Sequence, residues 1–152
     1  MAHIKLRLEP PSTQIQMLFL NDAAVGAGCP NRRDDVLLVQ FFLWVLWGEK
    51  PDKITVIGSG PEPPVNGVCG TETIRAIEAF QKWYWNLPPR SGFTDGRVDL
   101  LPVGRTLGLL RKLPYTIIGL NVNFGAVYGV DRHARIGKES SFPAELKRKL
   151  FV

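Results

Sequence analysis

The side chains with the greatest chemical capacity in this chain are scattered along it rather than grouped. Among 152 residues there are two cysteines, Cys29 and Cys69, and two histidines, His3 and His133. Neither a CxxC nor an HxxxH spacing occurs, so a zinc site would need all four side chains to converge from distant positions. Each cysteine lies beside a glycine-rich loop and is expected to be a small, buried apolar residue. The sequence therefore predicts no metal site and no cofactor.

Asp34 and Asp35 are paired carboxylates of the kind that general acid–base catalysis uses. They also stand in the first turn of a predicted helix, where the helix dipole favours negative charge, and this second explanation is the stronger one. No GxSxG, HExxH or GxxxxGK[ST] motif occurs in the chain. We therefore expect a binding or assembly protein rather than an enzyme.

An aromatic cluster, Trp83-Tyr84-Trp85, ends a predicted helix. Aromatic faces pack on sugar rings and are frequent at protein interfaces. Residues two apart point about 200° apart on a helix, so Trp83 and Trp85 cannot both face inward with Phe80. One of them is expected to contact either a flanking segment of the chain or an external ligand, and the sequence leaves both open.

The first predicted helix spans Arg32 to Trp47, with Asn31 as its N-cap and Asp34 completing an approximate capping box. From Val36 to Trp47 eleven of twelve residues are apolar, and Gln40 is the exception. A surface helix has one polar face. This helix must therefore be buried on most sides, by the rest of the chain or by another subunit.

The remaining pattern predicts a mainly α fold with short strands near both ends. Thr71 is expected to cap a second helix that ends before Pro88-Pro89, and a short basic helix is expected at Ala144 to Leu150. The other predicted elements are a strand at His3 to Leu8 with Ile4, Leu6 and Leu8 on one face, strands at Gln14 to Leu20 and Lys53 to Ile57, a third helix at Pro102 to Lys112, and extended chain or a hairpin at Tyr115 to Tyr128.

Two stretches share one layout, a tight Asn-Gly or Asp-Gly turn, a short apolar link and then a helix. They begin at Val65-Asn66-Gly67 and at Asp95-Gly96-Arg97, and Gln40 and Gln81 stand on the helices before them. Buried amides need partners, so both glutamines are expected to bond the backbone of buried loops. Together with Asp35-Val36, Leu43 and Ala76 to Gln81, this ordered set resembles the peptidoglycan-binding-domain-like family over about residues 25–112.

The resemblance implies a three-helix module at 25–112, an N-terminal β extension at 1–24 and a β-rich, basic C-terminal extension at 113–152. The sequence departs from the family pattern at three positions, Asn66, Cys69 and Asp99, where the family usually has Asp, Phe and Gly, respectively. It implies non-catalytic binding of peptidoglycan glycan or stem peptide. The candidate ligand-binding residues are Asn66, Gly67, Thr71, Thr73, Trp83, Trp85, Asp95 and Gly96.

A second hypothesis makes the chain a structural subunit of a phage-like or contractile secretion particle. Strand edges and apolar surfaces then contact a protein partner or another copy of the chain. The candidate interface residues are Ile4, Leu6, Leu8, Phe42, Trp44 and Trp47. The apolar run from Met17 to Leu20 is only four residues long, which predicts no signal peptide, and no run is long enough for a membrane span. Synthesis in the cytoplasm is therefore expected, with release or injection as part of a particle.

The net charge of +5 is concentrated at the C-terminal end, where residues 131–152 contain six basic and three acidic residues. Such an end suits an acidic polymer or partner, or is a solvated tail. The basic residues are few and no recognition motif accompanies them, so nucleic-acid binding is not expected.

Overall fold

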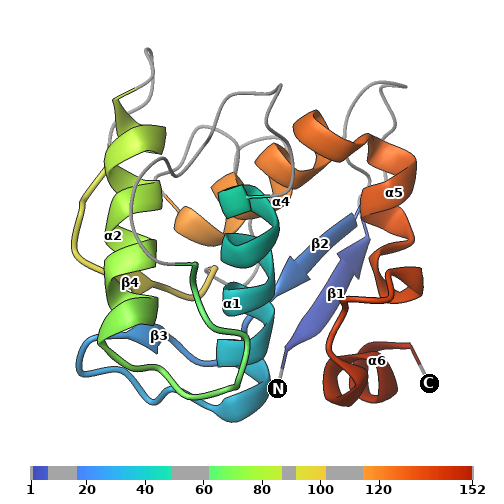
Figure 1. Ribbon diagram of the computed structural model, residues 1–152, viewed down its shortest axis with the longest axis horizontal. Helices are drawn as coiled ribbons and strands as arrows, with labels where there is room; N and C mark the ends of the chain where they lie inside the picture. Colours follow the sequence, from blue (N-terminus) through green and yellow to red (C-terminus); the bar gives the residue numbers. More distant parts are fainter. Residues whose placement is uncertain (1, 7–16, 49–61, 87–91, 102–114, 152) are drawn as a thin grey trace.

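The computed structural model describes residues 2–6, 17–48, 62–86, 92–101 and 115–151, and over these it confirms a mainly α fold with short strands (Figure 1). The predicted strand at Lys53 to Ile57, the predicted helix at Pro102 to Lys112 and Leu8 lie outside these residues. The helices are α1 (Arg33–Gly48), α2 (Thr71–Trp85), α4 (Thr116–Tyr128), α5 (Val130–Ala134), the 3₁₀ turn η1 (Ile136–Lys138) and α6 (Ala144–Leu150). The strands are β1 (His3–Leu6), β2 (Met17–Leu20), β3 (Val25–Gly26) and β4 (Arg97–Val98).

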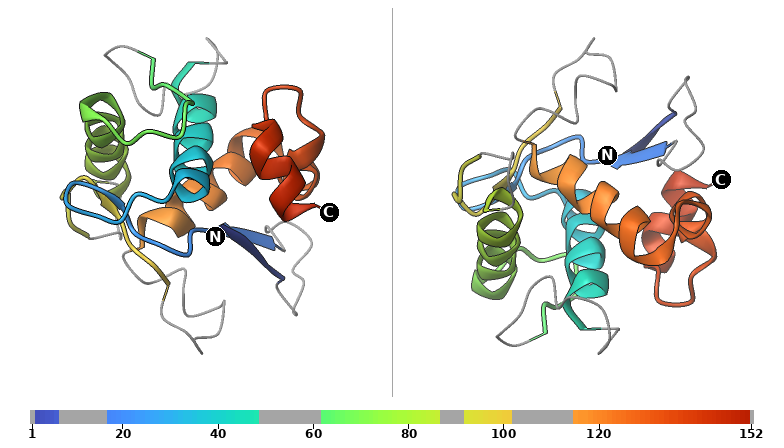
Figure 2. Two further views of the ribbon diagram at one scale, coloured as in Figure 1. Left: turned by 90° about the horizontal axis from the view of Figure 1, so that it is seen from below. Right: turned by 90° about the horizontal axis from the view of Figure 1, so that it is seen from above.

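Helix α1 is the centre of the molecule, and Figure 2 shows it between α2 on one side and the C-terminal helices on the other. It packs on α2, α4, α6, β2 and β3. This confirms that a helix apolar nearly all round is buried by the rest of the chain. Phe42 is fully buried against Phe124, with ring centroids 5.9 Å apart, so it is a core residue and the prediction that it lies at an external interface is wrong. Trp44 and Trp47 remain half-buried.

Helix α4 lies where the sequence predicted extended chain or a hairpin, and that prediction is wrong. Its β-branched residues and glycines disfavour a helix locally, but tertiary burial overrides propensity. Residues 116–121 and 123–125 are all buried. Gly119 faces the ring of Tyr84 so closely that an added Cβ would lie 2.9 Å from Tyr84 Cε1. The glycine therefore permits close packing of α4 on α2 rather than breaking the helix.

β1 and β2 form a two-stranded antiparallel ribbon in which Ile4 lies opposite Phe19. The side chain of Asn121, on α4, closes the outer edge of β2. Its Oδ1 accepts the N–H of Phe19 at 2.9 Å, and its Nδ2 donates to the Phe19 carbonyl at 3.0 Å. The described part of the C-terminal extension, 115–151, is helical and contains no strand, so short strands occur only toward the N-terminal side of α4.

The start of α1 differs from the predicted capping box. Asn31 has φ 50° and is not the N-cap; its side chain bonds both N–H and C=O of Gly26 instead. Asp34 and Asp35 are buried, and their carboxylates accept backbone N–H groups of the preceding chain, Ala2 for Asp34 and Asp22 and Ala23 for Asp35. Burial raises the pKa of Asp35, against the opposing effect of its bond from Asp22. The paired acids therefore fasten the N-terminal segment to α1.

A buried histidine completes the core between β2 and the C-terminal helices. His133 is fully buried, its ring centroid is 5.2 Å from Phe19 and 5.8 Å from Phe124, and its Nε2 lies 2.9 Å from Asn121 Oδ1. That oxygen also accepts the Phe19 N–H, so the shared hydrogen belongs to Nε2 and Nδ1 is left without a partner among the described residues. Burial lowers the pKa of His133 to about 4, so the ring is neutral at physiological pH.

The C-terminal helix α6 has the bounds that the sequence predicted, Ala144–Leu150, and ion pairs join it to the rest of the molecule. Arg33 Nε binds Glu145 Oε2 at 2.9 Å, and Lys149 Nζ lies 3.8 Å from Asp34. Arg132 binds both carboxylate oxygens of Glu139 at 2.8 Å, which lowers the pKa of Glu139.

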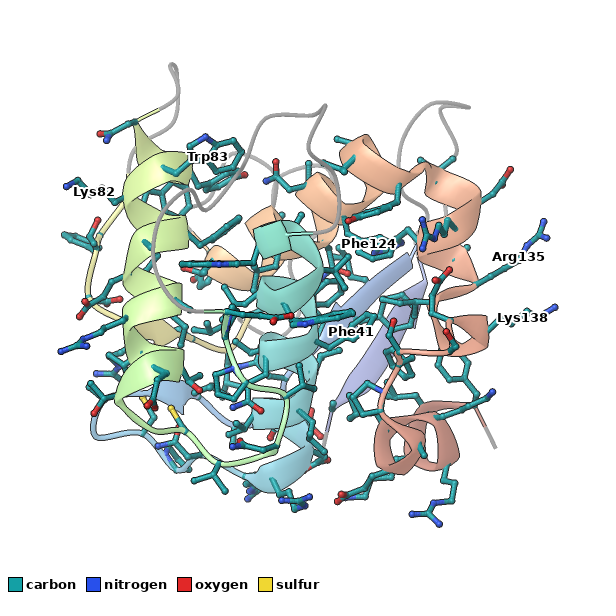
Figure 3. The ribbon with its side chains drawn as sticks, viewed as in Figure 1. Phe41, Lys82, Trp83, Phe124, Arg135 and Lys138 are labelled. Atoms are coloured by element: carbon teal, nitrogen blue, oxygen red, sulfur yellow. The ribbon has the colours of Figure 1, made fainter. Side chains whose placement is uncertain are left out.

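Figure 3 shows other basic side chains of the C-terminal end, Arg135 and Lys138, pointing outward, and both are exposed. None of the described helices is long and apolar enough to cross a membrane.

Candidate ligand-binding site

Gln40, the one polar residue in the apolar run of α1, binds the first predicted turn. Its Oε1 accepts the N–H groups of Asn66 and Gly67 at 3.0 and 2.8 Å. Its Nε2 donates to Asn66 Oδ1, the Val68 carbonyl and Thr73 Oγ1, at 3.2, 3.0 and 2.9 Å. Asn66 Oδ1 accepts the Val68 N–H as well, at 2.9 Å. This arrangement, here termed the Gln40 clasp, joins α1 through the turn to the start of α2.

Gln81, on α2, makes the same set of bonds to the second turn. Its Oε1 accepts the N–H groups of Asp95 and Gly96 at 3.1 and 2.9 Å, and its Nε2 donates to Asp95 Oδ1, the Arg97 carbonyl and Thr116 Oγ1, at 3.0, 2.8 and 3.0 Å. Asp95 Oδ1 also accepts the Arg97 N–H at 3.0 Å. This Gln81 clasp joins α2 through its turn to the start of α4. The prediction that both glutamines bond backbone in buried loops is therefore confirmed.

The two clasps belong to a unit that occurs twice in the chain. In each copy a tryptophan follows the glutamine by four residues, and it lies against the segment just before the turn. Trp44 lines a pocket with residues 62–65, and Trp85 packs on Gly92, where an added Cβ would lie 2.5 Å from Trp85 Cε2. The second copy ends on α4, beyond the boundary near 112 that the sequence pattern suggested.

Most of the residues that the sequence nominated for ligand binding serve the clasps. The side-chain oxygens of Asn66 and Asp95 fold back into their own turns, and Thr73 is buried against Gln40. Gly67 and Gly96 are buried with φ values of +77° and +69°, a conformation that glycine adopts without strain. These residues therefore form turn structure, with their main polar atoms already bonded within the protein.

Thr71 and the two nominated tryptophans have other surroundings. Thr71 is exposed at the first position of α2; Gly70 is the N-cap and no side chain caps the helix, so the predicted Thr71 cap is wrong. Trp83 is half-buried with its ring centroid 6.0 Å from that of Phe80 (Figure 3). Trp85 meets Tyr84 edge-on at 4.5 Å, and its Nε1 is buried without a partner among the described residues. Of the two, Trp85 is the one that packs on a flanking segment.

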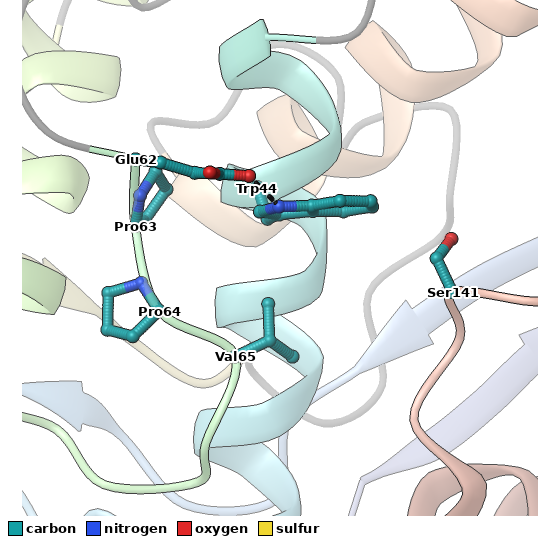
Figure 4. Close-up of a pocket in the computed structure, with 6 residues that line it drawn as sticks. All are labelled: Trp44, Glu62, Pro63, Pro64, Val65 and Ser141. Atoms are coloured by element: carbon teal, nitrogen blue, oxygen red, sulfur yellow. Dashed lines mark hydrogen bonds between the residues drawn. The ribbon is translucent and has the colours of Figure 1, made fainter.

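An open pocket lies beside the Gln40 clasp, between α1, the segment before the turn and the loop that leads into α6 (Figure 4). Its volume is about 390 Å³, within the range of roughly 300–1,000 Å³ typical of small-molecule sites. The half-buried indole of Trp44 points across it, and Trp44 Nε1 donates a hydrogen bond to the carboxylate of Glu62. The pocket is lined by Trp44, Glu62, Pro63, Pro64, Val65 and Ser141.

Sequence reasoning placed Trp44 at an interface and missed the rest of this pocket. The available signal was the spacing of Trp44 and Trp85 behind the two glutamines, together with the acidic, proline-rich segment before Asn66. Ser141 had no such signal, because only the folded chain brings the loop before α6 beside α1.

A second hollow, beside the Gln81 clasp, is much smaller. It has a volume of about 30 Å³, which is room for one or a few water molecules rather than for a ligand. Asp95, Phe93 and Tyr115 line it, and Phe93 is 78% exposed. The two copies of the unit are therefore not equivalent as binding sites.

Metal-binding groups are not assembled in the part of the chain that the structure describes. There, no group of three or more His, Cys, Asp or Glu side chains lies close enough to bind an ion. Cys29 and Cys69 are free and half-buried rather than fully buried, and burial raises the pKa of the Cys69 thiol.

Compared with protein-family models, with curated proteins and with solved structures, the chain gives no match in any of the three searches.

Proposed function

We propose that this chain is a non-catalytic module that binds peptidoglycan of the bacterial cell wall, and that the Trp44 pocket is its binding site. The observation that supports the proposal most directly is the pocket itself. It combines concave shape, a half-buried aromatic ring and a few polar groups, which is the usual composition of a small-molecule site.

The chemistry of the pocket suits a flat, polar ligand with an apolar face. An indole ring packs on the C–H faces of sugars and on aliphatic chains, while the Glu62 carboxylate and the Ser141 hydroxyl bond polar hydrogens. The bond from Trp44 Nε1 to Glu62 fixes the ring and the carboxylate relative to each other. A pre-organised site loses less conformational entropy when a ligand binds.

The two clasps support the resemblance on which the wall-binding proposal also depends. The residues that define the family-like pattern, Gln40, Gln81 and the Asx-Gly turns, form one repeated hydrogen-bond unit. Because fold does not determine ligand, the clasps bear on the resemblance alone, and the choice of binding site depends on the pocket.

The proposal is tested by co-sedimentation of the purified protein with insoluble peptidoglycan sacculi at physiological salt. We expect the wild-type protein to sediment, and Trp44→Ala to weaken binding about tenfold or more, because a buried aromatic anchor contributes about 2 kcal/mol or more to an interface. Trp83→Ala is the comparison variant, since Trp83 is also half-buried but does not line the pocket. Far-UV circular dichroism confirms that each variant is folded.

Sedimentation lost in Trp83→Ala but kept in Trp44→Ala would contradict the choice of pocket. Sedimentation of none of the proteins would contradict wall binding itself.

The second candidate function is a structural subunit of a phage-like or contractile particle, and one observation favours it. Phe19 turns its N–H and C=O toward Asn121, so in the antiparallel ribbon the opposite residue, Ile4, turns its own backbone groups away from β2. The outer edge of β1 therefore has the polarity needed to pair with a strand of another chain. The side chains of Ile4 and Leu6 lie outside the description. A molecular mass well above 17.0 kDa in size-exclusion light scattering, together with no sedimentation of the protein with sacculi, would favour this function.

A further inference from the structure

We infer that the group recognised in the Trp44 pocket is a primary ammonium on an aliphatic chain, which in peptidoglycan is the free side-chain amine of the stem peptide's diamino acid. This inference rests on the proposed function and names the part of the wall polymer that the pocket receives. The glycan strand is then bound, if at all, outside the pocket.

Charge is the first argument. Among the described residues that line the pocket, Glu62 is the only charged one, so this part of the lining is acidic in a protein whose net charge is +5. The guanidinium of Arg33, at the start of α1, is already bound to Glu145 and to the Asn66 carbonyl. A carboxylate or phosphate would therefore meet like charge in the pocket, whereas an ammonium would meet a carboxylate.

The balance of hydrogen-bond donors and acceptors is the second argument. Pro63 and Pro64 have carbonyls but no backbone N–H, and the indole N–H of Trp44 is taken by Glu62. The remaining carboxylate oxygen of Glu62 has no hydrogen-bond partner among the described residues. A wall of this kind offers acceptors and few donors. An ammonium is a group with three donors and no acceptor, whereas sugar hydroxyls and acetamides need both.

The indole ring and the apolar wall are the third argument. A cation within about 6 Å of an indole face is attracted by the ring quadrupole, and tryptophan is the strongest aromatic partner for it. Glu62 anchors the Trp44 ring from one edge, so the same carboxylate both positions the ring and completes the charge of the site (Figure 4). Pro63, Pro64 and Val65 supply an apolar surface for the methylene groups that precede an amine.

The experiment compares two preparations of the same sacculi, one native and one in which acetic anhydride has converted the free amines to amides. For the wild-type protein we expect acetylation to weaken binding by about three- to tenfold, which is the loss expected for one partly exposed ion pair with a cation–π contact. Long-range attraction between the basic protein and the wall predicts the opposite effect of acetylation on binding. Acetylation removes positive charge from the wall, so a basic protein without an amine site would bind acetylated sacculi as well or better.

Two charge-matched variants locate the effect. Glu62→Gln keeps an acceptor for Trp44 Nε1 but removes the charge, and we expect it to bind native sacculi about three- to tenfold more weakly and to be indifferent to acetylation. Glu72→Gln removes the same charge at the start of α2, outside the pocket, and is expected to respond to acetylation as the wild type does.

The outcomes separate the inference from the proposed function. Equal wild-type binding to native and acetylated sacculi overturns the ammonium inference, while wall binding stands as long as sedimentation depends on Trp44. An acetylation effect that persists in Glu62→Gln places the amine site elsewhere and also overturns the inference. Failure of the wild type to sediment with native sacculi overturns both the proposed function and the inference.

Discussion

At the scale of single residues, buried polar side chains join parts of the chain that are far apart in sequence. Asn121 uses both ends of its amide on β2 and also bonds the Ile117 carbonyl and His133. His133 therefore occupies a site that requires its neutral form, with its hydrogen on Nε2 and with Nδ1 unpaired among the residues that the structure describes. Burial is the cause of its lowered pKa.

The neutral His133 predicts a specific loss of stability in mild acid. Its folded pKa is about 4, below the unfolded value of 6.5, so between these values the unfolded chain binds the proton more readily. The stability that it contributes is complete above pH 6.5 and falls by about 3 kcal/mol as the pH drops to 4. Urea unfolding of the wild type and of His133→Phe from pH 4 to 8 measures the difference.

We expect the free-energy curves of these two proteins to diverge steadily between pH 6.5 and 4, with the wild type losing more. His3 is present in both and cancels in the comparison. Parallel curves would show that His133 is not buried in its neutral form.

The residues that sequence could nominate are those that break a strong local pattern. Gln40 is conspicuous as the one polar residue among apolar neighbours, and its clasp was predicted in kind. Asn121 and His133 lie in stretches without such a pattern, and their partners are 102 and 12 residues away, respectively, so no local signal marks them. Glu62 and Ser141 meet at the Trp44 pocket for the same reason, through tertiary contact alone.

At the scale of elements, the clasps act as joints between one helix and the next. Each glutamine satisfies two backbone N–H groups of a tight turn and bonds the threonine at the start of the following helix. A buried amide with all its bonds made stabilises modestly, but removing it leaves several buried groups unpaired, which costs far more. The two clasps differ in the group that the turn presents to the glutamine. In the first turn it is the neutral amide of Asn66, and in the second it is the carboxylate of Asp95.

That difference predicts unequal effects of an isosteric change. In Gln40→Glu and Gln81→Glu the donor Nε2 becomes an oxygen facing acceptors, so both variants lose stability, by about 3 kcal/mol or more at neutral pH. Gln81→Glu also brings a second carboxylate to about 3 Å from Asp95 Oδ1, the position that Nε2 now occupies. We expect it to be the less stable variant by at least about 1 kcal/mol, measured by thermal or urea unfolding at pH 7.

Lowering the pH toward 5 should narrow this difference in stability, because a proton bound between two neighbouring carboxylates removes their repulsion. Equal destabilisation of the two variants at both pH values would mean that the clasps are not the bonded units described here.

The elements themselves were predictable where local pattern and tertiary context agree. α1, α2, β1 and α6 follow from apolar periodicity and terminal signals, and the sequence placed them within a few residues of their observed bounds. α4 was missed because its glycines and β-branched residues disfavour a helix until they are buried against α1 and α2. Asparagine is common both at helix N-caps and in loops, so the sequence alone does not distinguish the two roles of Asn31. In the structure its side chain bonds Gly26 in the loop instead of an N–H of the helix.

At the scale of the whole molecule, α1 is the shared core of every part. The N-terminal segment is fastened to its start by Asp34 and Asp35, α2 and α4 pack along it, and the C-terminal end meets it through Phe142. The ring centroids of Phe142 and Phe41 lie 4.9 Å apart in an edge-to-face contact. The segments that the sequence separated as extensions therefore share one hydrophobic core with the central helices.

A single core predicts one cooperative unfolding transition in which the C-terminal end unfolds together with α1 and α2. Phe142→Ala tests this, because Phe142 lies just before α6 while all four tryptophans lie on α1 and α2. Emptying a buried phenylalanine site costs about 3 kcal/mol or more. We expect tryptophan fluorescence to report this full decrease in the free energy of unfolding when Phe142→Ala is unfolded in urea. Circular dichroism is expected to give the same midpoint. Unchanged fluorescence with an earlier change in circular dichroism would instead mean that the C-terminal helices unfold separately, and that 113–152 is an independent extension after all.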